Sequence, residues 1–397
     1  MTLKEVQALK NWLLVTLLIT LLAACGGTSS TQAPPQAETE EEAPAETTGE
    51  QAATGDSLAV DPALLSDELY FFNWSDYIDP QILEDFEAEY GVRVVQDLYD
   101  SNEAMLPKIR AGNSGYDIVV PSDYAVEVMI LEGLLAPLDK VLLPNMQYLN
   151  EDLLNMYYDP ENTYSVPYFW GTTGIAYNSK FFETPPTTLA AIFEPENLEA
   201  IDGRFTVLDD PRETPATALL YLGEDINTTN EDVLQQAEAL LTQQKPYVSA
   251  YDSANQGLKL ATEEIMLAHT YSGSAGQAIV GIDDEPANPN LVYIIPEEGG
   301  VIWQDNLAIV ADSPNKYTAH VFINYLMRPD VAARNTDYVL YLTPNTAVRD
   351  LLAEATIAVF EAGVEPTEEQ MQRLQWIERN EQTDTLYTDL WTRVISQ

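Results

Sequence analysis

The sequence predicts an α/β fold with mostly parallel sheets, and three observations lead to that prediction. Short apolar runs alternate along the chain with segments whose apolar residues recur at helical spacing. The 397 residues suffice for two or three domains, at roughly 100 to 200 residues per domain. Polar and aromatic residues directly follow the predicted strands. Because ligands of such folds bind outside the carboxyl ends of strands, these residues are the first candidates for a binding site.

Strand and helix alternate from residue 69 onward. Strands are predicted at 69–73, 92–95 and 116–120, and helices at 79–90, at 105–111 and from 126 to 131. In the first of these helices Ile82, Leu83 and Phe86 recur at helical spacing, and Gly91 follows as a stop signal.

The alternation continues through the rest of the chain. Further strands are predicted at 174–177, 205–208, 247–250 and 265–270, a helix at 233–241, and an apolar stretch at 307–310. We find no internal repeat at the periods typical of solenoids or propellers. The pattern therefore favours α/β units over a repeat architecture.

The first 24 residues are predicted to be an export leader. Lys4 and Lys10 precede an apolar stretch at 12–22, which is too short to span a membrane and is typical of a secretory signal. The stretch ends in Leu-Ala-Ala-Cys-Gly, which resembles the bacterial lipobox and would make Cys25 the lipid-modified N-terminus of a lipoprotein. The alternative is an ordinary secretory signal followed by a stray cysteine.

Residues 25–68 are predicted to form a lipid-anchored, acidic, disordered tether. The stretch 26–68 is rich in Thr, Ala, Glu, Pro and Gln, and it carries ten acidic residues and no basic residue. It lacks a sustained apolar period, so it cannot bury enough surface to offset the entropy of folding.

The chain is strongly acidic, with 64 Asp and Glu against 18 Lys and Arg and a formal charge of −46. This charge disfavours nucleic acids, anionic lipid surfaces and phosphate-rich ligands, and it favours a cationic ligand. The alternative is a surface adapted to a salty habitat or to solubility. One cysteine and two histidines cannot supply the usual zinc clusters. Calcium ligated by oxygen is not excluded by this count, but we expect no metal and no cofactor.

The segment Trp74, Ser75, Asp76 and Tyr77 follows the first predicted strand. Aromatic faces attract ammonium groups by ~0.5 to 2 kcal/mol, and a desolvated carboxylate supplies a specific charge partner. The segment therefore predicts a site for a cation. The alternative is that Trp74 and Tyr77 pack the domain edge while Asp76 caps the next helix.

Similar clusters follow other predicted strands. The residues concerned are Ser122, Asp123 and Tyr124, then Asp210, Arg212 and Glu213, then Tyr271. Trp303 and Asp305 point to one face if their segment is extended, because side chains alternate along a strand. Each cluster alone is weak, since Asp-rich turns are often helix caps. Their repetition at strand ends is the signal.

Enzymatic interpretations have less support. Ser274 lies in a segment similar to a nucleophile elbow, but Ser272 replaces the expected glycine and His320 has no defining context. His269 lies in an apolar run and is interpreted as a core histidine. Many carboxylates are present, but no spacing singles out a hydrolytic pair. Neither a phosphate-binding loop nor a dinucleotide fingerprint occurs. We therefore predict that the protein is not an enzyme.

The clusters lie in longer stretches that resemble the polyamine-binding proteins of bacterial ABC importers, the spermidine/putrescine-binding family. The stretches are LYFFNWSDYIDP (69–80), GYDIVVPSDY (115–124), YSVPYFWGTTGIAYN (164–178), LDDPRE (208–213), EEGGVIWQDNLAI (297–309), INYLMRPDVA (323–332) and YLTPN (341–345). They cover nearly the whole body in colinear order, and together they are highly specific.

The resemblance implies a fold of the periplasmic-binding-protein type, with two α/β lobes that close on ligand by a hinge motion. The expected bounds are 69–172 plus 303–350 for lobe 1 and 173–302 plus 351–397 for lobe 2. The expected crossings between lobes are near 171–174, near 300–303 and around 350.

The resemblance also implies the residues that contact the ligand. They are Trp74, Ser75, Asp76, Tyr77, Ser122, Tyr124, Trp303, Asp305 and Tyr341 on the first lobe, and Asp210, Glu213 and Tyr271 on the second. By that matching, Trp303 and the tyrosines stack on the methylene chain and Asp305 binds an inner amine. Asp210 with Glu213 grips one terminal ammonium, and Asp76 serves the other end.

The chain departs from the family pattern at several positions. Tyr271 stands where tryptophan is common, and Asp123 adds a carboxylate where a neutral residue is usual. Residues beyond about 352 match poorly, and the family's amide contact has no counterpart near Trp376. The pattern at Trp303 and Tyr124 looks closer to the spermidine-preferring branch, and Asp123 could add affinity for a longer polyamine.

The expected function is extracytoplasmic capture of spermidine, putrescine or both, and delivery to the permease subunits of an ABC importer. We expect a monomer, lipid-anchored through Cys25 at the periplasmic or extracellular face of the cytoplasmic membrane, with no nucleic-acid partner. One alternative is a receptor of the same fold for another small organic cation or an amino acid derivative. A second is a secreted hydrolase that uses carboxylates.

Overall fold

The structure is a computed structural model, and it describes residues 58–282, 285–378 and 381–396. The predicted leader, Cys25 and the predicted tether up to residue 57 lie outside the described residues. Within the described ranges, none of the helices combines the length and the apolar character needed to span a bilayer.

The described chain alternates strands and helices, as the sequence predicts. The strands are β1 (Glu68–Trp74), β2 (Arg93–Tyr99), β3 (Ile118–Val119), β4 (Ser165–Asn178), β5 (Phe205–Val207), β6 (Ala250–Tyr251), β7 (Leu267–Tyr271), β8 (Leu291–Ile294), β9 (Gly300–Ile309) and β10 (Leu374–Trp376). The helices are α2 (Pro80–Tyr90), α3 (Asn102–Arg110), α4 (Asp123–Leu131), α5 (Ala190–Phe193), α6 (Pro195–Ala200), α7 (Glu213–Leu222), α8 (Glu231–Gln244), α9 (Gln256–Ala261), α10 (Ser272–Val280), α11 (Lys316–Leu326), α12 (Pro329–Val339), α13 (Glu354–Val359), α14 (Glu368–Met371) and α15 (Glu381–Ser396).

The strands form two parallel sets joined by two long strands. The order across the sheet is β2-β1-β3-β9-β4-β7-β5-β6, with β10 beside β9 and β8 beside β4. Pairing is parallel within β2-β1-β3 and within β6-β5-β7. It is antiparallel where β4 and β9 pair with each other and with β3 and β7. The fold prediction is confirmed: two α/β lobes, with mostly parallel sheets, share a pair of crossing strands.

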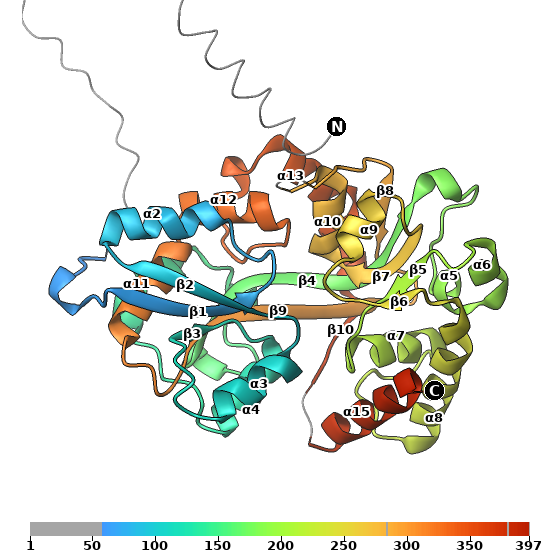
Figure 1. The fold of residues 1–397 in the computed structure, drawn as a ribbon, viewed down its shortest axis with the longest axis horizontal. Helices are drawn as coiled ribbons and strands as arrows, with labels where there is room; N and C mark the ends of the chain where they lie inside the picture. Colours follow the sequence, from blue (N-terminus) through green and yellow to red (C-terminus); the bar gives the residue numbers. More distant parts are fainter. Residues whose placement is uncertain (1–57, 283–284, 379–380, 397) are drawn as a thin grey trace, which may run out of the picture. The chain divides into compact units, whose positions relative to one another are not determined.

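The register shows where the crossing strands change lobes. The start of β4 pairs Ser165 with Ala308, beside β3 of the first lobe, whereas its end pairs Tyr177 with Leu267 of the second. Between them Gly171 lies opposite Trp303. Figure 1 shows β4 and β9 running side by side from one lobe to the other.

Helices cover both faces of the first lobe's sheet. Phe71 of β1 packs edge-on against Phe322 of α11, with ring centroids 5.5 Å apart. Its neighbour Phe72 points to the opposite face and joins a buried cluster with residues of α3 and α4. Figure 1 shows α2 above these strands and α3 and α4 below them. Alternation along a strand buried on both faces explains the near-continuous apolar run from which this strand was predicted.

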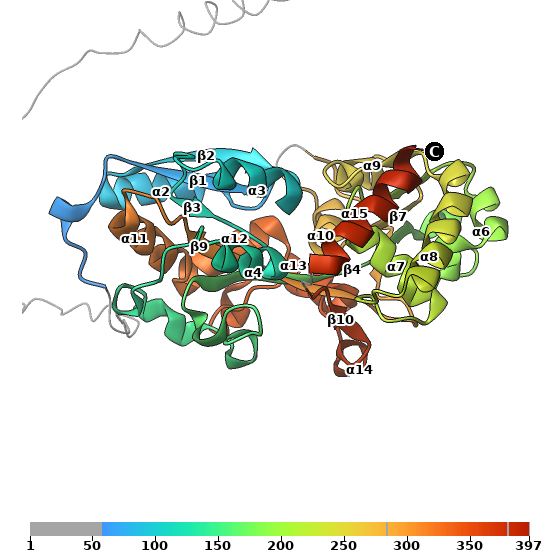
Figure 2. The same ribbon diagram turned by 90° about the horizontal axis from the view of Figure 1, so that it is seen from below.

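The C-terminal helix α15 packs on the second lobe, where Figure 2 shows it alongside α7 and α8. Tyr387 is fully buried, and its hydroxyl donates to the carbonyl oxygen of Ile226 at 2.7 Å. Trp391 Nε1 donates to Asp209 Oδ1 at 3.2 Å, next to the end of β5. The last part of the chain is therefore held close to the acidic turn after that strand.

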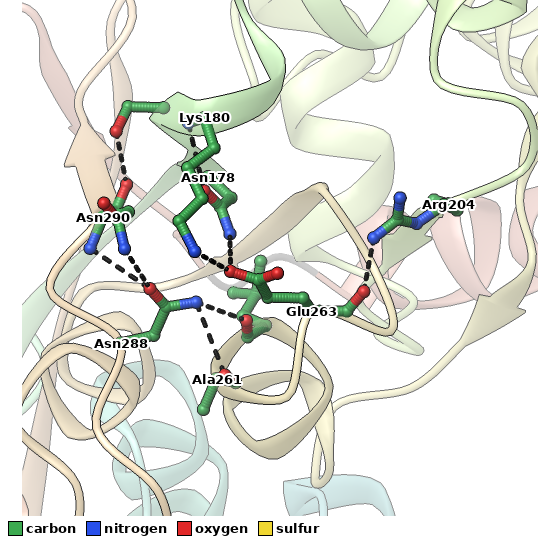
Figure 3. A network of polar contacts seen from close by, with 9 residues as sticks. Asn178, Lys180, Arg204, Ala261, Glu263, Asn288 and Asn290 are labelled. Atoms are coloured by element: carbon green, nitrogen blue, oxygen red, sulfur yellow. Dashed lines mark hydrogen bonds and ion pairs between the residues drawn. The ribbon is translucent and has the colours of Figure 1, made fainter.

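A polar network fixes the outer edge of the second lobe (Figure 3). Glu263, which has φ of 60°, accepts hydrogen bonds from Lys180 Nζ at 2.6 Å and from Asn178 Nδ2 at 3.3 Å. Arg204 donates to the carbonyl oxygens of Glu263 and Glu264. These contacts tie the end of β4 to the turn between α9 and β7.

Two sequence predictions need correction. The ordered body begins before residue 69: Pro62–Leu64 forms a 3-10 helix, and the amide of Ser66 donates to Thr318 Oγ1 at 2.9 Å. The predicted tether is therefore too long at its C-terminal end. The strand predicted at 247–250 is reduced to β6, because Pro246 starts a 3-10 turn over Lys245–Tyr247 and only two residues pair with β5.

Candidate ligand-binding site

A cavity lies where the carboxyl ends of strands from both lobes meet. It encloses about 960 Å³ of empty space, its open mouth included. Every residue predicted to contact ligand lines it: Trp74, Ser75, Asp76, Tyr77, Ser122, Tyr124, Asp210, Glu213, Tyr271, Trp303, Asp305 and Tyr341. The structure thus brings together residues that are more than 260 positions apart in the sequence.

Short connections place these side chains. Residues 74–77 end β1 and begin the turn before α2, and Ser122 lies between β3 and α4. Asp210 follows β5, Glu213 begins α7, and Tyr271 ends β7. Such strand-to-helix turns present their side chains at one edge of the sheet, which is why strand ends predicted the site.

Glycines allow the aromatic residues to approach the backbone. A Cβ on Gly171 would lie 2.7 Å from the indole of Trp303, and one on Gly273 would lie 2.4 Å from the ring of Tyr341. A side chain at either position would displace a cavity ring. Packing against Trp303 therefore requires the glycine at the β4 crossing.

Asp305 is the acid on the first lobe's side of the cavity. Tyr77 Oη donates to its Oδ2 at 2.7 Å, and Ser122 Oγ donates to its Oδ1 at 2.6 Å. Burial raises the pKa of Asp305 to about 6, although both hydrogen bonds act to lower it. The carboxylate is held in place before any ligand arrives, because both of its oxygens have donors.

Aromatic rings line the cavity on either side of this acid. Trp303 contacts Tyr271 and Tyr341 edge-on, with centroids 5.7 and 5.4 Å away. Tyr341 contacts Tyr77 in the same manner at 5.2 Å. The indole Nε1 of Trp303 donates to Thr173 Oγ1 at 3.2 Å, which fixes the ring plane. The expectation that Trp303 and Asp305 share one face agrees with their common place in the cavity wall.

A second acidic group comes from the other lobe. Asp210 Oδ1 accepts the backbone amides of Arg212 and Glu213, each at 2.8 Å, and Tyr271 Oη lies 3.5 Å from its Oδ2. Glu213 is buried, and its Oε2 has no hydrogen-bond partner. Burial raises the pKa of both carboxyl groups, and the charge of Asp210 raises that of Glu213 further. A bound cation would relieve both effects.

Asp76 and Tyr124 also line the cavity. Asp76 does not cap the helix that follows it. Asp79, and not Asp76, caps α2 by accepting the amide of Gln81 at 2.9 Å. Asp76 has φ of 52°, and Gln277 Nε2 donates to its carbonyl oxygen at 3.2 Å. The capping alternative for Asp76 is therefore wrong.

Several cavity residues were not predicted to bind ligand. They are Tyr99, Asp100, Asn102, Arg212, Ser253, Ala254, Ser274, Gln277 and Ile377. Asp123, which the sequence suggested only as an addition for longer polyamines, also lines the cavity. Arg212 connects the cavity to the C-terminal part of the chain. Its guanidinium lies 4.9 Å from the ring centroid of Tyr387 and donates to the carbonyl oxygen of Glu378 at 3.2 Å. The sequence could have indicated Arg212 as a cavity residue, because it lies in the turn after a predicted strand. No sequence pattern indicated Ile377, which follows β10 near the end of the chain.

The groups considered for hydrolysis serve other purposes. His269 is a buried core histidine, as predicted: Nε2 lies 2.8 Å from Thr217 Oγ1, and burial lowers its pKa to about 3. His320 bonds to the backbone of Lys316 and Asp139. Ser274 Oγ is 3.0 Å from Tyr341 Oη. Neither histidine is therefore directed at this serine.

Fold and cavity together define a two-lobed binding protein for small solutes. The profile of bacterial extracellular solute-binding proteins matches residues 81–360, and the chain belongs to this family.

Individual relatives show which members of this family the chain resembles. The putrescine-binding periplasmic protein SpuD of Pseudomonas aeruginosa is 37% identical over 338 residues, which cover 83% of this chain and 92% of the relative. The spermidine/putrescine-binding periplasmic protein of Salmonella typhimurium is 39% identical over 290 residues, 72% of this chain and 80% of the relative. A solved structure of a putative spermidine/putrescine ABC transporter from Listeria monocytogenes matches with a TM-score of 0.77 at 36% identity, covering 83% of this chain and 99% of that one. The resemblance predicted from the sequence is confirmed.

Proposed function

We propose that this protein captures a polyamine between its two lobes, outside the cytoplasm, and delivers it to the permease of an ABC importer. The observation that carries the proposal is one cavity in which buried carboxyl groups from both lobes flank a set of aromatic rings. A polyamine has the matching form, because charged ammonium groups alternate along it with apolar methylene segments. The putrescine- and spermidine-binding relatives support the same ligand class.

In this proposal each part of the ligand has its own contact. Asp305 binds an inner amine, and Asp210 with Glu213 binds one terminal ammonium. Asp76 binds the opposite end. Trp303 and the tyrosines around it pack on the methylene carbons between these charges.

Ligand capture proceeds by closure of the lobes about the strands that join them. We assign residues 69–172 and 303–350 to lobe 1, and 173–302 and 351–397 to lobe 2. Closing brings Asp210 and Glu213 to a polyamine already held at Asp305. No bond in the ligand is made or broken, so the protein acts as a receptor and not as an enzyme.

The proposed lipid anchor is based on the lipobox-like sequence that contains Cys25. Cys25 carries the lipid that holds the receptor at the outer face of the cytoplasmic membrane. One acyl chain gives only marginal binding to a bilayer, so Cys25 carries more than one. The body works as a monomer.

Thermal unfolding with and without ligands tests the proposal. A ligand at about 100 times its Kd stabilises by ~2.7 kcal/mol, so putrescine, spermidine or spermine should raise Tm by several degrees, whereas neutral amino acids should not. A response to every polycation that disappears with moderate salt would indicate surface acidity alone. A response to a different organic cation and to none of the polyamines would favour the other-solute receptor.

A further inference from the structure

The turn after β1 presents cavity residues, and its members are held from different directions. Trp74 Nε1 donates to the carbonyl oxygen of Val120 at 2.8 Å, and Tyr77 Oη donates to Asp305 at 2.7 Å, so the first lobe's own side of the cavity fixes both rings. Asp76 lies between them with φ of 52°. This left-handed conformation is unfavourable for residues other than glycine, and it persists where the surrounding contacts support it.

A contact that supports Asp76 comes from α10 of the second lobe. Gln277 is half-buried and lines the cavity, and its Nε2 donates to the carbonyl oxygen of Asp76 at 3.2 Å and to that of Val339 at 3.1 Å. An amide nitrogen carries two hydrogens and can make both bonds, whereas an amide oxygen in the same place would face two carbonyl oxygens. The two partners therefore fix the orientation of the Gln277 amide.

Val339 gives this amide a firm attachment to the first lobe. It is the last residue of α12, where carbonyl groups lack partners within the helix. Arg334 of the same helix donates to Asp79 Oδ2 at 2.8 Å and to Asp85 Oδ2 at 2.7 Å, which ties α12 to the start of α2. Gln277 thus connects the end of α12 to the turn that precedes α2.

Small residues bring α10 close enough for this contact. Gly273, Gly276 and Gln277 share one face of the helix, because residues three and four positions apart lie together on its surface. A Cβ on Gly276 would lie 3.1 Å from the Cβ of Leu340, the residue after Val339. The face of α10 that carries Gln277 therefore packs against the first lobe.

We propose that Gln277 is a positioning residue that holds Asp76 in its ligand-binding conformation, so that this end of the cavity is completed when α10 docks on the first lobe. The inference rests on the proposed function, in which Asp76 binds one end of the polyamine. It assigns the placement of an acid on one lobe to a neutral side chain of the other.

A double-mutant cycle tests whether Gln277 acts through Asp76. Gln277→Met keeps a long, helix-favouring side chain and removes the donor. Titration calorimetry of the full chain should give a spermidine Kd ~3- to 10-fold higher, within the range of one hydrogen bond. In an Asp76→Asn background the same substitution should change the Kd by less than about twofold, because asparagine tolerates the left-handed conformation but lacks the charge that Gln277 positions. Equal losses in both backgrounds would overturn the link to Asp76.

Binding kinetics tests the inter-lobe part of the inference. Gln277 and Asp76 belong to different lobes, so losing their contact should raise the dissociation rate of spermidine and leave its association rate within about twofold. A loss confined to the association rate would contradict this role.

Gln277→Glu separates positioning from charge, and it serves as well if the methionine variant does not fold. It keeps the shape of the side chain, removes the amide donors and adds an acid to the cavity. Weaker spermidine binding would support the positioning role. Tighter binding would overturn it, because the added charge would then matter more than the lost donors.

Gln236→Met is the matched control. Gln236 is exposed on α8, away from the cavity, and donates to the carbonyl oxygen of Asp232 at 3.2 Å. Its substitution removes a similar hydrogen bond and should leave the Kd and both rates unchanged. An unchanged Kd in Gln277→Met would overturn the inference and leave the receptor function intact, whereas failure of every polyamine to bind the unmodified protein would overturn both.

Discussion

The two acidic sites of the cavity are built in opposite ways. On the first lobe, both oxygens of Asp305 accept hydrogen bonds, from Tyr77 and Ser122. On the second lobe, Asp210 is held by backbone amides, while Glu213 beside it keeps an unpartnered oxygen. One site is ready before ligand arrives and the other is incomplete without a cation. Under the proposed function, we therefore expect a polyamine to bind first at Asp305, and closure then to satisfy the acids of the second lobe.

The largest loss of affinity is expected when Asp305, the acid with two hydrogen-bonded oxygens, is substituted. Asp305→Asn should weaken spermidine binding by about 2 to 5 kcal/mol, because it leaves a buried ammonium group without its charge partner. Calorimetry gives the Kd, and circular dichroism of the ligand-free variant confirms that the fold is intact. An unchanged Kd would remove Asp305 from the site.

A smaller loss of affinity is expected when Glu213, the acid with an unpartnered oxygen, is substituted. Glu213→Gln should weaken binding by about 1.5 to 3 kcal/mol, the range of one hydrogen bond to a charged group, while the ligand-free Tm stays equal or rises. Asp210→Ala should instead lower the ligand-free stability by about 0.5 to 2 kcal/mol, because its backbone contacts resemble a helix cap. If both variants lose stability equally, the contrast between these neighbouring acids is wrong.

The pH dependence of stability sharpens the comparison further. The pKa of Asp123 is raised to about 8 in the folded protein, against about 3.9 for an ordinary aspartate. Its folded state therefore retains a proton that the unfolded chain releases, and this stabilisation is lost as pH rises from about 4 through 8. Tm of the unmodified protein should consequently fall more steeply over this range than Tm of Asp123→Asn. Parallel curves would show that Asp123 titrates normally.

The smallest change in affinity is expected for substitution of Asp100, at the exposed rim of the cavity. Asp100 is exposed, and only Ser75 Oγ lies near one of its oxygens, at 3.5 Å. Asp100→Asn should change the Kd of spermidine by less than about twofold at moderate salt, because exposed charges are screened. A loss comparable to that of Asp305→Asn would mean that general acidity, and not the buried groups, holds the ligand.

Much of the site could be predicted because strand ends of parallel sheets converge. Trp74, Asp210 and Tyr271 each follow an apolar run that does form a strand, so their meeting follows from the fold class. Asp305 was found because alternation along a strand places it on the face of Trp303. In these cases a local pattern also determines the tertiary position.

Other features depend on contacts that no local pattern contains. Ile377 reaches the cavity because β10 pairs in parallel with the start of β9, more than 70 residues earlier in the chain. Residues 351–397 were assigned to lobe 2, but no helix was predicted there, whereas α15 packs on α7 and α8 of that lobe. The early start of the ordered body depends on the contact of Ser66 with Thr318, which lies on α11. Pairing across such separations is decided by packing, not by periodicity.

The central claim is that one polyamine is held by buried acids from both lobes. Titration calorimetry with spermidine at low and at high salt tests it most directly, with Asp305→Asn and Glu213→Gln measured alongside. The account predicts one binding event per chain, a Kd that remains measurable at high salt, and a loss in each variant. Several weak sites per chain that vanish with salt, and that are unaffected by either substitution, would contradict it.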